Sequence, residues 1–355
     1  MSQWVFVHSS DELYGADRVL LEVLKALPHA VRERSVVWLP NDVPHGPYPL
    51  CRELERRGIP YEHVALPIIR RALLSPRGLA RLASLTVKSW RRVRRSDPEV
   101  LYGTTSATAL VLWGATRLGV RCIFHLQEVW SPREAAVLGR LVRNAETVVA
   151  VSHAAAKSMG GQLSARARVV PNTCPDPGAV PLPAAPPISF LFAGRWTTRK
   201  GIDVLLRAWS LLDEDRRLTV VGSVPAAGGI DVAQLAAATS AELAVVGEVP
   251  DVSDLWTSHH VLVMPSVEAE SFGLSALEAM AHGRPVVAST AGALPEVVGD
   301  AGWLVPPGDS RALAFALAGI TAEAVAERGR RARLRYLEMF SPQDFGRRWR
   351  AAVGL

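Results

Sequence analysis

Residues 188–201 form the stretch Ile188-Ser189-Phe190-Leu191-Phe192-Ala193-Gly194-Arg195-Trp196-Thr197-Thr198-Arg199-Lys200-Gly201, which indicates the fold class to expect. Its first six residues are an apolar run typical of a buried strand, and helical periodicity begins near Ile202, directly after the loop. A strand that leads through a short loop into a helix is the repeating unit of parallel sheets with helices on both faces.

The same alternation extends through the rest of the chain in both directions. Before residue 188 the sequence predicts strands at Trp4–His8, Ser35–Leu39, Val100–Gly103, Cys122–Leu126 and Val148–Ser152, with helices near Gly15–Leu27 and Leu50–Arg57. After it we expect strands at Leu218–Gly222, Leu243–Val246, Val261–Pro265 and Pro285–Ser289. Between the two series, seven of the 17 residues 171–187 are proline, which disfavours both helix and central strand and indicates a linker.

We therefore predict an α/β protein with two doubly wound, Rossmann-like domains, residues 1–173 and 188–340, joined by the Pro-rich linker 174–187. The closing helix, within 341–355, could pack on either domain by sequence alone. Parallel sheets bind ligands outside the carboxyl ends of their strands, and two such sheets face to face make a cleft. Functional residues are expected in the loops that follow strands.

Length and composition agree with two packed domains. The chain has 355 residues, of which 49% are hydrophobic and 21% charged. No run approaches the ~18 apolar residues of a membrane span, and Trp4–Val7 is too short for a signal-peptide core, so we expect a cytoplasmic protein. Cys51, Cys122 and Cys174 have no metal-ligand spacing and leave one unpaired in any disulfide scheme, so we expect neither zinc nor disulfides to hold the fold together.

One local segment makes the chain basic. Residues 69–95 contain nine Lys or Arg and no acid, whereas the net charge of the chain is +6, so the remainder carries −3 (6 less 9). Leu79, Leu82, Leu85 or Thr86, Trp90 and Val93 recur at helical spacing, which predicts a basic amphipathic helix. Our hypothesis is peripheral association with anionic lipid on the inner face of the membrane; the alternative is a solvated outer helix that packs on the sheet. No nucleic-acid-binding motif accompanies the segment, so no nucleic acid is expected.

Two loops carry candidate ligand-binding residues. Arg195 and Lys200 lie where a strand gives way to a helix amino terminus, which indicates an anion site; the alternative is a solvated loop with incidental charges. In the stretch Pro265–Gly283, helical periodicity begins near Gly273, whose missing side chain lets a ligand approach the backbone. The free N–H groups of Gly273, Leu274 and Ser275 would face that ligand. Glu278, about one turn into the helix, could accept the paired hydroxyls of a ribose, and Glu270 lies on the preceding loop; for each acid the alternative is an ordinary solvated side chain.

Together these stretches resemble the retaining glycosyltransferases of family 4 (glycosyl transferases group 1), which have the GT-B fold. The likeness is carried by Gly194, Arg195, Lys200, Gly201, Glu270, Glu278, Gly283-Arg284-Pro285-Val286-Val287 and Gly292-Ala293-Leu294-Pro295-Glu296-Val297-Val298. It implies a nucleotide-diphosphate-sugar donor, with Arg195 and Lys200 at the diphosphate, Glu278 at the ribose and Glu270 at the sugar. Gly194 and the Phe272-Gly273-Leu274-Ser275 turn would line the donor site, and the closing helix would cross back to the first, acceptor-side domain.

The first domain departs from the family pattern in two places. The turn after its first strand contains Tyr14-Gly15-Ala16-Asp17, where many relatives have two glycines, so only Gly15 matches as a donor contact. His125-Leu126-Gln127-Glu128 keeps one of the two histidines that many relatives have. The resemblance places His125 against the donor sugar or the acceptor; the alternative is a strand-end histidine without a chemical role.

No metal or cofactor is expected. Asp213-Glu214-Asp215 matches an Asp-x-Asp metal motif, but it falls in a polar turn at the amino end of a predicted strand, away from the expected ligand edge. Arg195, Lys200 and helix N–H groups would instead stabilise the charge on the leaving oxygen. Retention of the anomeric configuration is implied by the resemblance alone.

The sequence thus favours transfer of a sugar from a UDP- or GDP-sugar to a glycan or lipid-linked glycan in cell-envelope polysaccharide synthesis. A small-molecule acceptor and a non-catalytic nucleotide-sugar-binding subunit remain as alternatives. A dinucleotide-dependent oxidoreductase is disfavoured, because Leu13-Tyr14-Gly15-Ala16-Asp17 lacks Gly-x-Gly-x-x-Gly.

Overall fold

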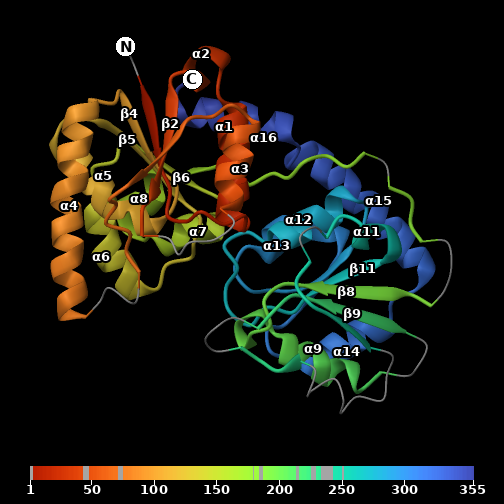
Figure 1. Ribbon diagram of the computed structural model, residues 1–355. Coiled ribbons are helices and arrows are strands. Elements are labelled where there is room, and N and C mark those ends of the chain that lie inside the picture. The colour runs from red at the N-terminus through yellow and green to blue at the C-terminus, as the bar shows by residue number, and fades with distance from the viewer. Residues whose placement is uncertain are drawn as a thin grey trace. The chain divides into compact units, whose positions relative to one another are not determined.

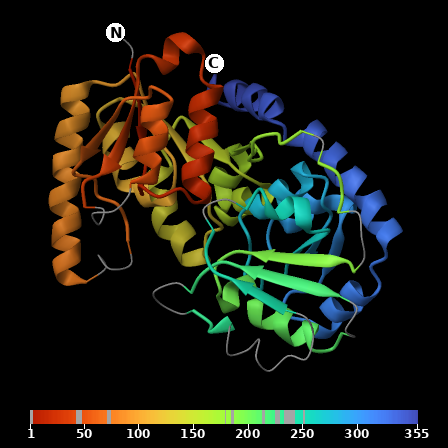
Figure 2. The same ribbon diagram turned by 45° about the vertical axis from the view of Figure 1, so that its right-hand side comes forward.

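The computed structural model describes residues 3–42, 48–70, 75–178, 180–183, 187–212, 216–224, 229–232, 243–249 and 252–355. The chain forms two compact units, here called the N-terminal unit (Met1–Asn172 with Phe345–Leu355) and the C-terminal unit (Thr173–Asp344) (Figures 1 and 2). The acidic turn Asp213–Asp215, Arg71 and parts of the Pro-rich linker lie outside the described residues.

The N-terminal unit is built on a seven-stranded parallel sheet of order β3-β2-β1-β4-β5-β6-β7. The strands are β1 (Trp4–Val7), β2 (Ser35–Pro40), β3 (Tyr61–Val64), β4 (Val100–Gly103), β5 (Arg121–Leu126), β6 (Thr147–Ala150) and β7 (Arg168–Val169). The helices are α1 (Gly15–Ala26), α2 (His29–Arg32), α3 (Pro49–Arg56), α4 (Pro76–Ser96), α5 (Ala109–Arg117), α6 (Pro132–Val142), α7 (His153–Ser158), α8 (Gly161–Arg166) and the closing α16 (Pro342–Val353). The central strands are continuous apolar runs because helices cover both faces of the sheet (Figures 1 and 2).

The closing helix α16 packs on the N-terminal unit. Trp349 is fully buried; its Nε1 donates to the Tyr102 hydroxyl at 3.0 Å, and its ring lies 6.3 Å from that of Trp4. Arg350 donates to the Ala26 carbonyl at 3.0 Å. Residues from the far end of the chain therefore complete the core that begins with β1.

Helix α4 presents its polar face outward, as expected, but its buried stripe differs from the predicted one. The buried positions are Gly78, Leu82, Thr86, Ser89 and Val93. Leu79, predicted in the stripe, is 53% exposed, because it lies one position beyond the face that turns toward the unit. Trp90 is half-buried: its ring packs against Trp113, with ring centroids 5.0 Å apart.

The C-terminal unit has a six-stranded parallel sheet of order β10-β9-β8-β11-β12-β13. Its strands are β8 (Ser189–Ala193), β9 (Arg217–Val221), β10 (Leu243–Val246), β11 (Val261–Met264), β12 (Val286–Ser289) and β13 (Trp303–Val305). Figure 1 shows α9 (Ile202–Trp209) and α14 (Ser310–Ala318) on one face and α12 (Leu274–Ala281) and α13 (Leu294–Val298) on the other. Helix α15 (Ala322–Met339) packs on α12, and the short α11 (Leu255–Ser258) precedes β11.

The prediction of two doubly wound α/β halves is confirmed, since every paired strand in both sheets runs parallel among the described residues. None of the helices described has the length and apolar character needed to span a membrane.

Candidate functional site

Two loops of the C-terminal unit are fixed against each other at the carboxyl edge of its sheet. The loop after β8 ends at Gly201, whose φ is +70°; a Cβ there would lie 2.0 Å from the Pro265 carbonyl oxygen. Val267 donates its backbone N–H to the Arg199 carbonyl at 2.9 Å. This close approach of two backbones requires glycine, and it brings the two stretches singled out in the sequence into contact.

An ion pair joins these loops. Lys200 Nζ lies 2.7 Å from Glu270 Oε1, and Ser266 Oγ donates to the same oxygen at 2.7 Å. Ser266 is positioned in turn, since its carbonyl accepts from Ser289 Oγ at 2.6 Å. The cation predicted for the diphosphate and the acid predicted for the sugar thus meet directly, a contact that the sequence did not reveal.

Glu270 keeps its charge despite its burial. Burial disfavours the carboxylate, but the Lys200 ammonium and the hydrogen bonds from Lys200 and Ser266 outweigh that effect and lower the pKa of Glu270 below its ordinary value. An ionised carboxylate accepts hydrogen bonds and cannot donate a proton. Glu270 is therefore suited to accept from hydroxyl groups and unsuited to act as a general acid near neutral pH.

The backbone of Glu270 is held by a third loop, which follows β12. Glu270 and Gly292 form a parallel bridge, and Ala293 donates to the Glu270 carbonyl at 2.9 Å. Gly292 has φ +64°, and a Cβ on it would lie 2.3 Å from the Glu270 carbonyl oxygen. Loops after three neighbouring strands, β8, β11 and β12, therefore define the position of one carboxylate.

Helix α12 begins shortly after Glu270 in the sequence. Its N-cap Gly273 has φ +107°, and a Cβ there would lie 2.8 Å from Leu294 Cδ2, so a side chain is excluded. The first N–H groups of the helix have no intrahelical partner and attract negative charge. Leu274, Ser275 and Glu278 are half-buried. Phe272 is buried against Phe340, with ring centroids 5.9 Å apart. Only the backbone of Phe272 is therefore available to a bound ligand.

The first part of the β8 loop is also positioned by close backbone contacts. Gly194 donates to the Val221 carbonyl at 3.0 Å, and a Cβ on Gly222 would lie 1.9 Å from the Gly194 carbonyl oxygen. Arg195 is exposed in the following position. Trp196 is buried, and its backbone N–H donates to the Ser223 carbonyl at 3.0 Å.

His125 lies near the end of β5 in the N-terminal unit. The ring is fully buried, and its Nδ1 lies 2.8 Å from the Tyr102 hydroxyl, which also accepts from Trp349. Burial lowers the pKa of His125 to about 3. Its burial beside Tyr102 supports the strand-end alternative, and the contact with sugar or acceptor stays a prediction.

Gly15 is the first residue of α1 and is half-buried. The turn before it is closed by Asp17, whose Oδ2 accepts from the Tyr14 N–H at 3.0 Å. The expected glycine thus lies at a helix start, beside a carboxylate that the sequence analysis did not single out.

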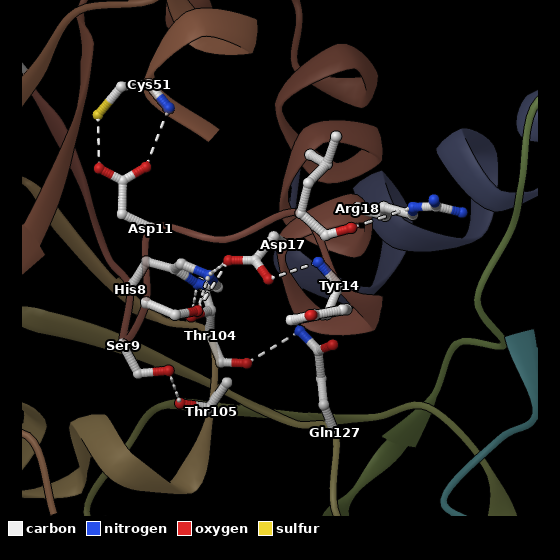
Figure 3. A network of polar contacts seen from close by, with 12 residues as sticks. His8, Ser9, Asp11, Tyr14, Asp17, Arg18, Cys51, Thr104, Thr105 and Gln127 are labelled. Carbon is white, nitrogen blue, oxygen red and sulfur yellow. Dashed lines mark hydrogen bonds and ion pairs between the residues drawn. The ribbon is translucent and has the colours of Figure 1, made fainter. Parts of the chain in front are cut away.

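That carboxylate belongs to a polar network at the carboxyl ends of β1, β4 and β5 (Figure 3). His8 is fully buried; its Nε2 lies 2.9 Å from Asp17 Oδ1, and its Nδ1 lies 2.6 Å from Thr104 Oγ1. Gln127 Nε2 donates to the Thr104 carbonyl at 2.9 Å. Burial raises the pKa of Asp17, but His8, Ser10 and the Tyr14 N–H outweigh it and lower that pKa overall. In the sequence, the polar residues that directly follow the first strand could have indicated this network.

Comparison with known proteins agrees with this architecture. Residues 187–323 match the profile described as "Glycosyl transferases group 1", and residues 14–173 match the "Glycosyl transferase 4-like domain". A D-inositol 3-phosphate glycosyltransferase of Streptomyces avermitilis is 36% identical over 197 residues, covering 51% of this chain and 40% of that protein. The lipopolysaccharide core biosynthesis mannosyltransferase LpcC of Rhizobium leguminosarum bv. viciae is 36% identical over 140 residues, covering 37% and 40%. The matched part of the chain spans less than half the length of these curated relatives.

Solved structures resemble the whole chain. Anabaena HepE in complex with UDP and glucose has a TM-score of 0.82 at 21% identity and full coverage of both chains. The sucrose-phosphate synthase of Thermosynechococcus elongatus has a TM-score of 0.79 at 20% identity, covering 100% of this chain and 98% of that one. These likenesses define the fold as that of the GT-B glycosyltransferases. Because the two profiles together match most of the residues, the chain belongs to glycosyltransferase family 4, the glycosyl transferases group 1.

Proposed function

We propose that the protein transfers a sugar from a nucleotide-diphosphate-sugar to a hydroxyl acceptor, with retention of the anomeric configuration and without a metal ion. The observation that carries this proposal is the ion pair of half-buried Lys200 with buried Glu270, just before the start of α12. It sets a fixed cation, a charged hydrogen-bond acceptor and free helix N–H groups at the carboxyl edge of one parallel sheet, where such sheets bind ligands.

Breaking the bond from the anomeric carbon to the diphosphate moves negative charge onto the leaving oxygen. Lys200 and Arg195 would neutralise that charge, and the N–H groups of Gly273, Leu274 and Ser275 would donate to the phosphates. Since Lys200 is already held by Glu270, it needs little reorganisation when the charge develops. The proposed acceptor attack on the same face, with the leaving phosphate oxygen as base, rests on the family resemblance.

We further propose that Glu270 accepts hydroxyls of the donor sugar and that Glu278 accepts those of the ribose. Gly15 stays a proposed donor contact from the N-terminal unit. The lowered pKa of Glu270 supports its role as an acceptor of hydrogen bonds. Solved neighbours hold UDP and UDP-glucose, which supports a UDP-sugar over a GDP-sugar donor. Thermal-shift screening against UDP-, GDP- and ADP-sugars would test this choice, and an equal response to all three would contradict it.

For the acceptor we propose a glycan or lipid-linked glycan of the cell envelope, as the name of the Rhizobium relative suggests. A second candidate is a small phosphorylated polyol, because several relatives are named D-inositol 3-phosphate glycosyltransferases. Radiolabelled transfer from the preferred donor into a membrane fraction, compared with transfer to inositol 3-phosphate, distinguishes them. Product only with the soluble acceptor would contradict the glycan proposal.

We also propose that α4 brings a cytoplasmic enzyme to anionic lipid on the inner face of the membrane. Lys88, Arg91, Arg94 and Arg95 are exposed on this helix. Its apolar stripe packs within the N-terminal unit, so attraction would be mainly electrostatic, at about 1 kcal/mol for each cation near the surface. Exposed Val87 could add a shallow apolar contact.

Donor hydrolysis by the purified protein tests catalysis itself. An enzyme of this class is expected to release nucleoside diphosphate slowly when water replaces the acceptor. Tight donor binding without hydrolysis or transfer to any glycan or polyol would instead favour a non-catalytic nucleotide-sugar-binding subunit.

A further inference from the structure

Three side chains of metal-ligand type meet in the N-terminal unit, and none of them belongs to the proposed donor site. Asp11 lies in the loop after β1, Cys51 in the first turn of α3 and His63 in the edge strand β3. Cys51 Sγ donates to Asp11 Oδ2 at 2.8 Å, His63 Nε2 lies 3.4 Å from the same oxygen, and Cys51 Sγ lies 3.9 Å from His63 Nε2. Figure 3 shows Asp11 turned toward Cys51.

The separations are close to those around one zinc ion. Zinc binds sulfur at about 2.3 Å and nitrogen or oxygen at about 2.0–2.2 Å, so neighbouring ligands of a tetrahedral ion lie roughly 3.3–3.8 Å apart. The His63–Asp11 and Cys51–His63 distances fall within or near this range. The sulfur–oxygen distance is shorter because the thiol proton bridges the two atoms. When a metal ion replaces that proton, the distance between Cys51 Sγ and Asp11 Oδ2 needs to increase by only about 1 Å.

The donor set selects the kind of ion. A thiolate and an imidazole favour zinc over magnesium or calcium, which prefer oxygen ligands. Asp11 is buried, and among the residues that the structure describes no lysine or arginine pairs with it. A buried carboxylate needs a compensating positive charge, which a divalent cation would supply. The other oxygen, Oδ1, accepts from the Cys51 N–H at 3.1 Å, which fixes the orientation of the carboxylate.

We propose that Asp11, Cys51 and His63 form a zinc site with its fourth position open to water. The His63 side chain is 36% exposed, so the ion has access from solvent. Bound zinc would tie the loop between β1 and α1 to α3 and β3. That loop continues into Tyr14 and Gly15, so the ion would position the turn proposed to face the sugar without taking part in bond cleavage.

Cobalt and zinc titrations test this site directly. Chelator-stripped protein is titrated with Co²⁺, which gives a near-ultraviolet charge-transfer band when it binds a thiolate, and Zn²⁺ is then added with a competing chromophoric chelator. We expect one equivalent of Co²⁺, displacement by Zn²⁺, and no band in Cys51→Ser. His63→Gln is expected to weaken zinc binding by at least about 100-fold. The matched control His29→Gln, at an exposed histidine of α2, should bind as the unchanged protein does.

The proposal is overturned if the unchanged protein shows no thiolate band at stoichiometric Co²⁺, or if the band persists in Cys51→Ser. It is overturned equally if His63→Gln binds zinc as tightly as His29→Gln, since that ion would lie elsewhere. His63 is half-exposed, so we expect His63→Gln to fold. The comparison of His63→Gln with His29→Gln therefore still tests the proposal if Cys51→Ser does not fold. No sugar transfer is measured, so failure here is separate from failure of the proposed function.

Discussion

Lys200 and Glu270 show how one contact can set the chemistry of two residues. Each is only partly accessible, with side-chain exposures of 26% and 8%, so solvent screens their attraction less than it would screen a surface pair. The pair keeps Glu270 charged, and Glu270 holds the ammonium in place. Losing Lys200 leaves the buried Glu270 carboxylate without its partner, which costs more than losing a surface ion pair.

Substitution of the two proposed diphosphate cations should therefore reduce catalysis. We expect Lys200→Ala and Arg195→Ala each to lower the turnover of donor hydrolysis by about 100-fold, because each removes charge stabilisation at the leaving oxygen. Arg207→Ala, at an exposed arginine of α9 that pairs with Asp203, is the matched control and should retain turnover. Circular dichroism checks folding. A folded variant with turnover close to that of Arg207→Ala would remove its residue from the proposed role.

Glu278→Ala should act on nucleotide binding instead. A carboxylate that accepts two ribose hydroxyls contributes about 1.5–3 kcal/mol, so loss of the side chain should weaken nucleoside diphosphate binding roughly 10- to 100-fold. Isothermal calorimetry with UDP measures this, with Glu327→Ala on α15 as the control. Equal affinity for the two variants would show that Glu278 does not hold the ribose.

At this scale the sequence predicted residue types better than their contacts. The strand-to-helix loops pointed to Lys200 and Glu270, but not to their direct pairing, because that depends on the approach of Gly201 to Pro265. His125 lies at a strand end that looks accessible in the sequence. It is buried beside Tyr102, which in turn bonds to Trp349 from the far end of the chain.

Among the elements, strands with an apolar sequence were predictable, and a strand without one was not. Strands β4 and β10 begin and end where the sequence placed them. β3 was missed because its residues, Tyr61 to Val64, are exposed or half-buried and form no apolar run. The proposed zinc site was hidden for the same reason, since His63 lies on this strand and Asp11 and Cys51 come from other elements.

Helix α4 offers a test of lipid association. Replacing Arg91, Arg92, Arg94 and Arg95 with Gln should abolish binding to anionic vesicles at low salt, because it removes most of the exposed positive charge of the helix. Donor hydrolysis should persist, since none of these four arginines is among the proposed donor residues. Co-sedimentation with anionic and neutral vesicles measures the effect. The control replaces four exposed arginines of α3 and α6, namely Arg52, Arg56, Arg133 and Arg140.

Equal partitioning onto neutral and anionic vesicles, or equal loss of binding in the control, would contradict a role for α4. Arg92 is the least available of the four cations, because it already forms an ion pair with Glu62.

For the whole molecule, buried histidines should make stability depend on pH. Burial lowers the pKa of His125 to about 3 and also lowers those of His259 and His260. Below about pH 6.5 these histidines become protonated in the unfolded chain but stay neutral in the folded protein. The free energy of unfolding therefore falls as pH falls. Each histidine that stays fully neutral in the folded protein lowers the free energy of unfolding by up to about 1.4 kcal/mol for each pH unit of acidification.

Urea unfolding at pH 7.5 and pH 5.5 measures this effect, in a range where Glu270 and Asp17 remain charged. We expect His125→Gln to reduce the loss of stability on acidification, and exposed His29→Gln to leave it unchanged. The explanation fails if both variants lose the same free energy as the unchanged protein.

Catalysis should also be independent of added metal. Donor hydrolysis is expected to survive EDTA, because in the proposed mechanism Arg195, Lys200 and the α12 N–H groups would take the place of a divalent cation. The measurement is made in His63→Gln as well, so that zinc lost from the N-terminal unit is not mistaken for a catalytic ion. Complete loss of activity in both proteins, restored by Mg²⁺ or Mn²⁺, would refute metal-independent transfer.

The position of α16 has a consequence for how the chain is made. Ribosomes release the N-terminal half first, and domains generally begin to fold in that order. Here the core around Trp4 and Tyr102 is complete only when Trp349 is present, and Trp349 is synthesised after the entire C-terminal unit. The half that is made first is thus completed last. Until then we expect the nascent protein to expose the aromatic surface that Trp349 later covers, and to bind chaperones through it.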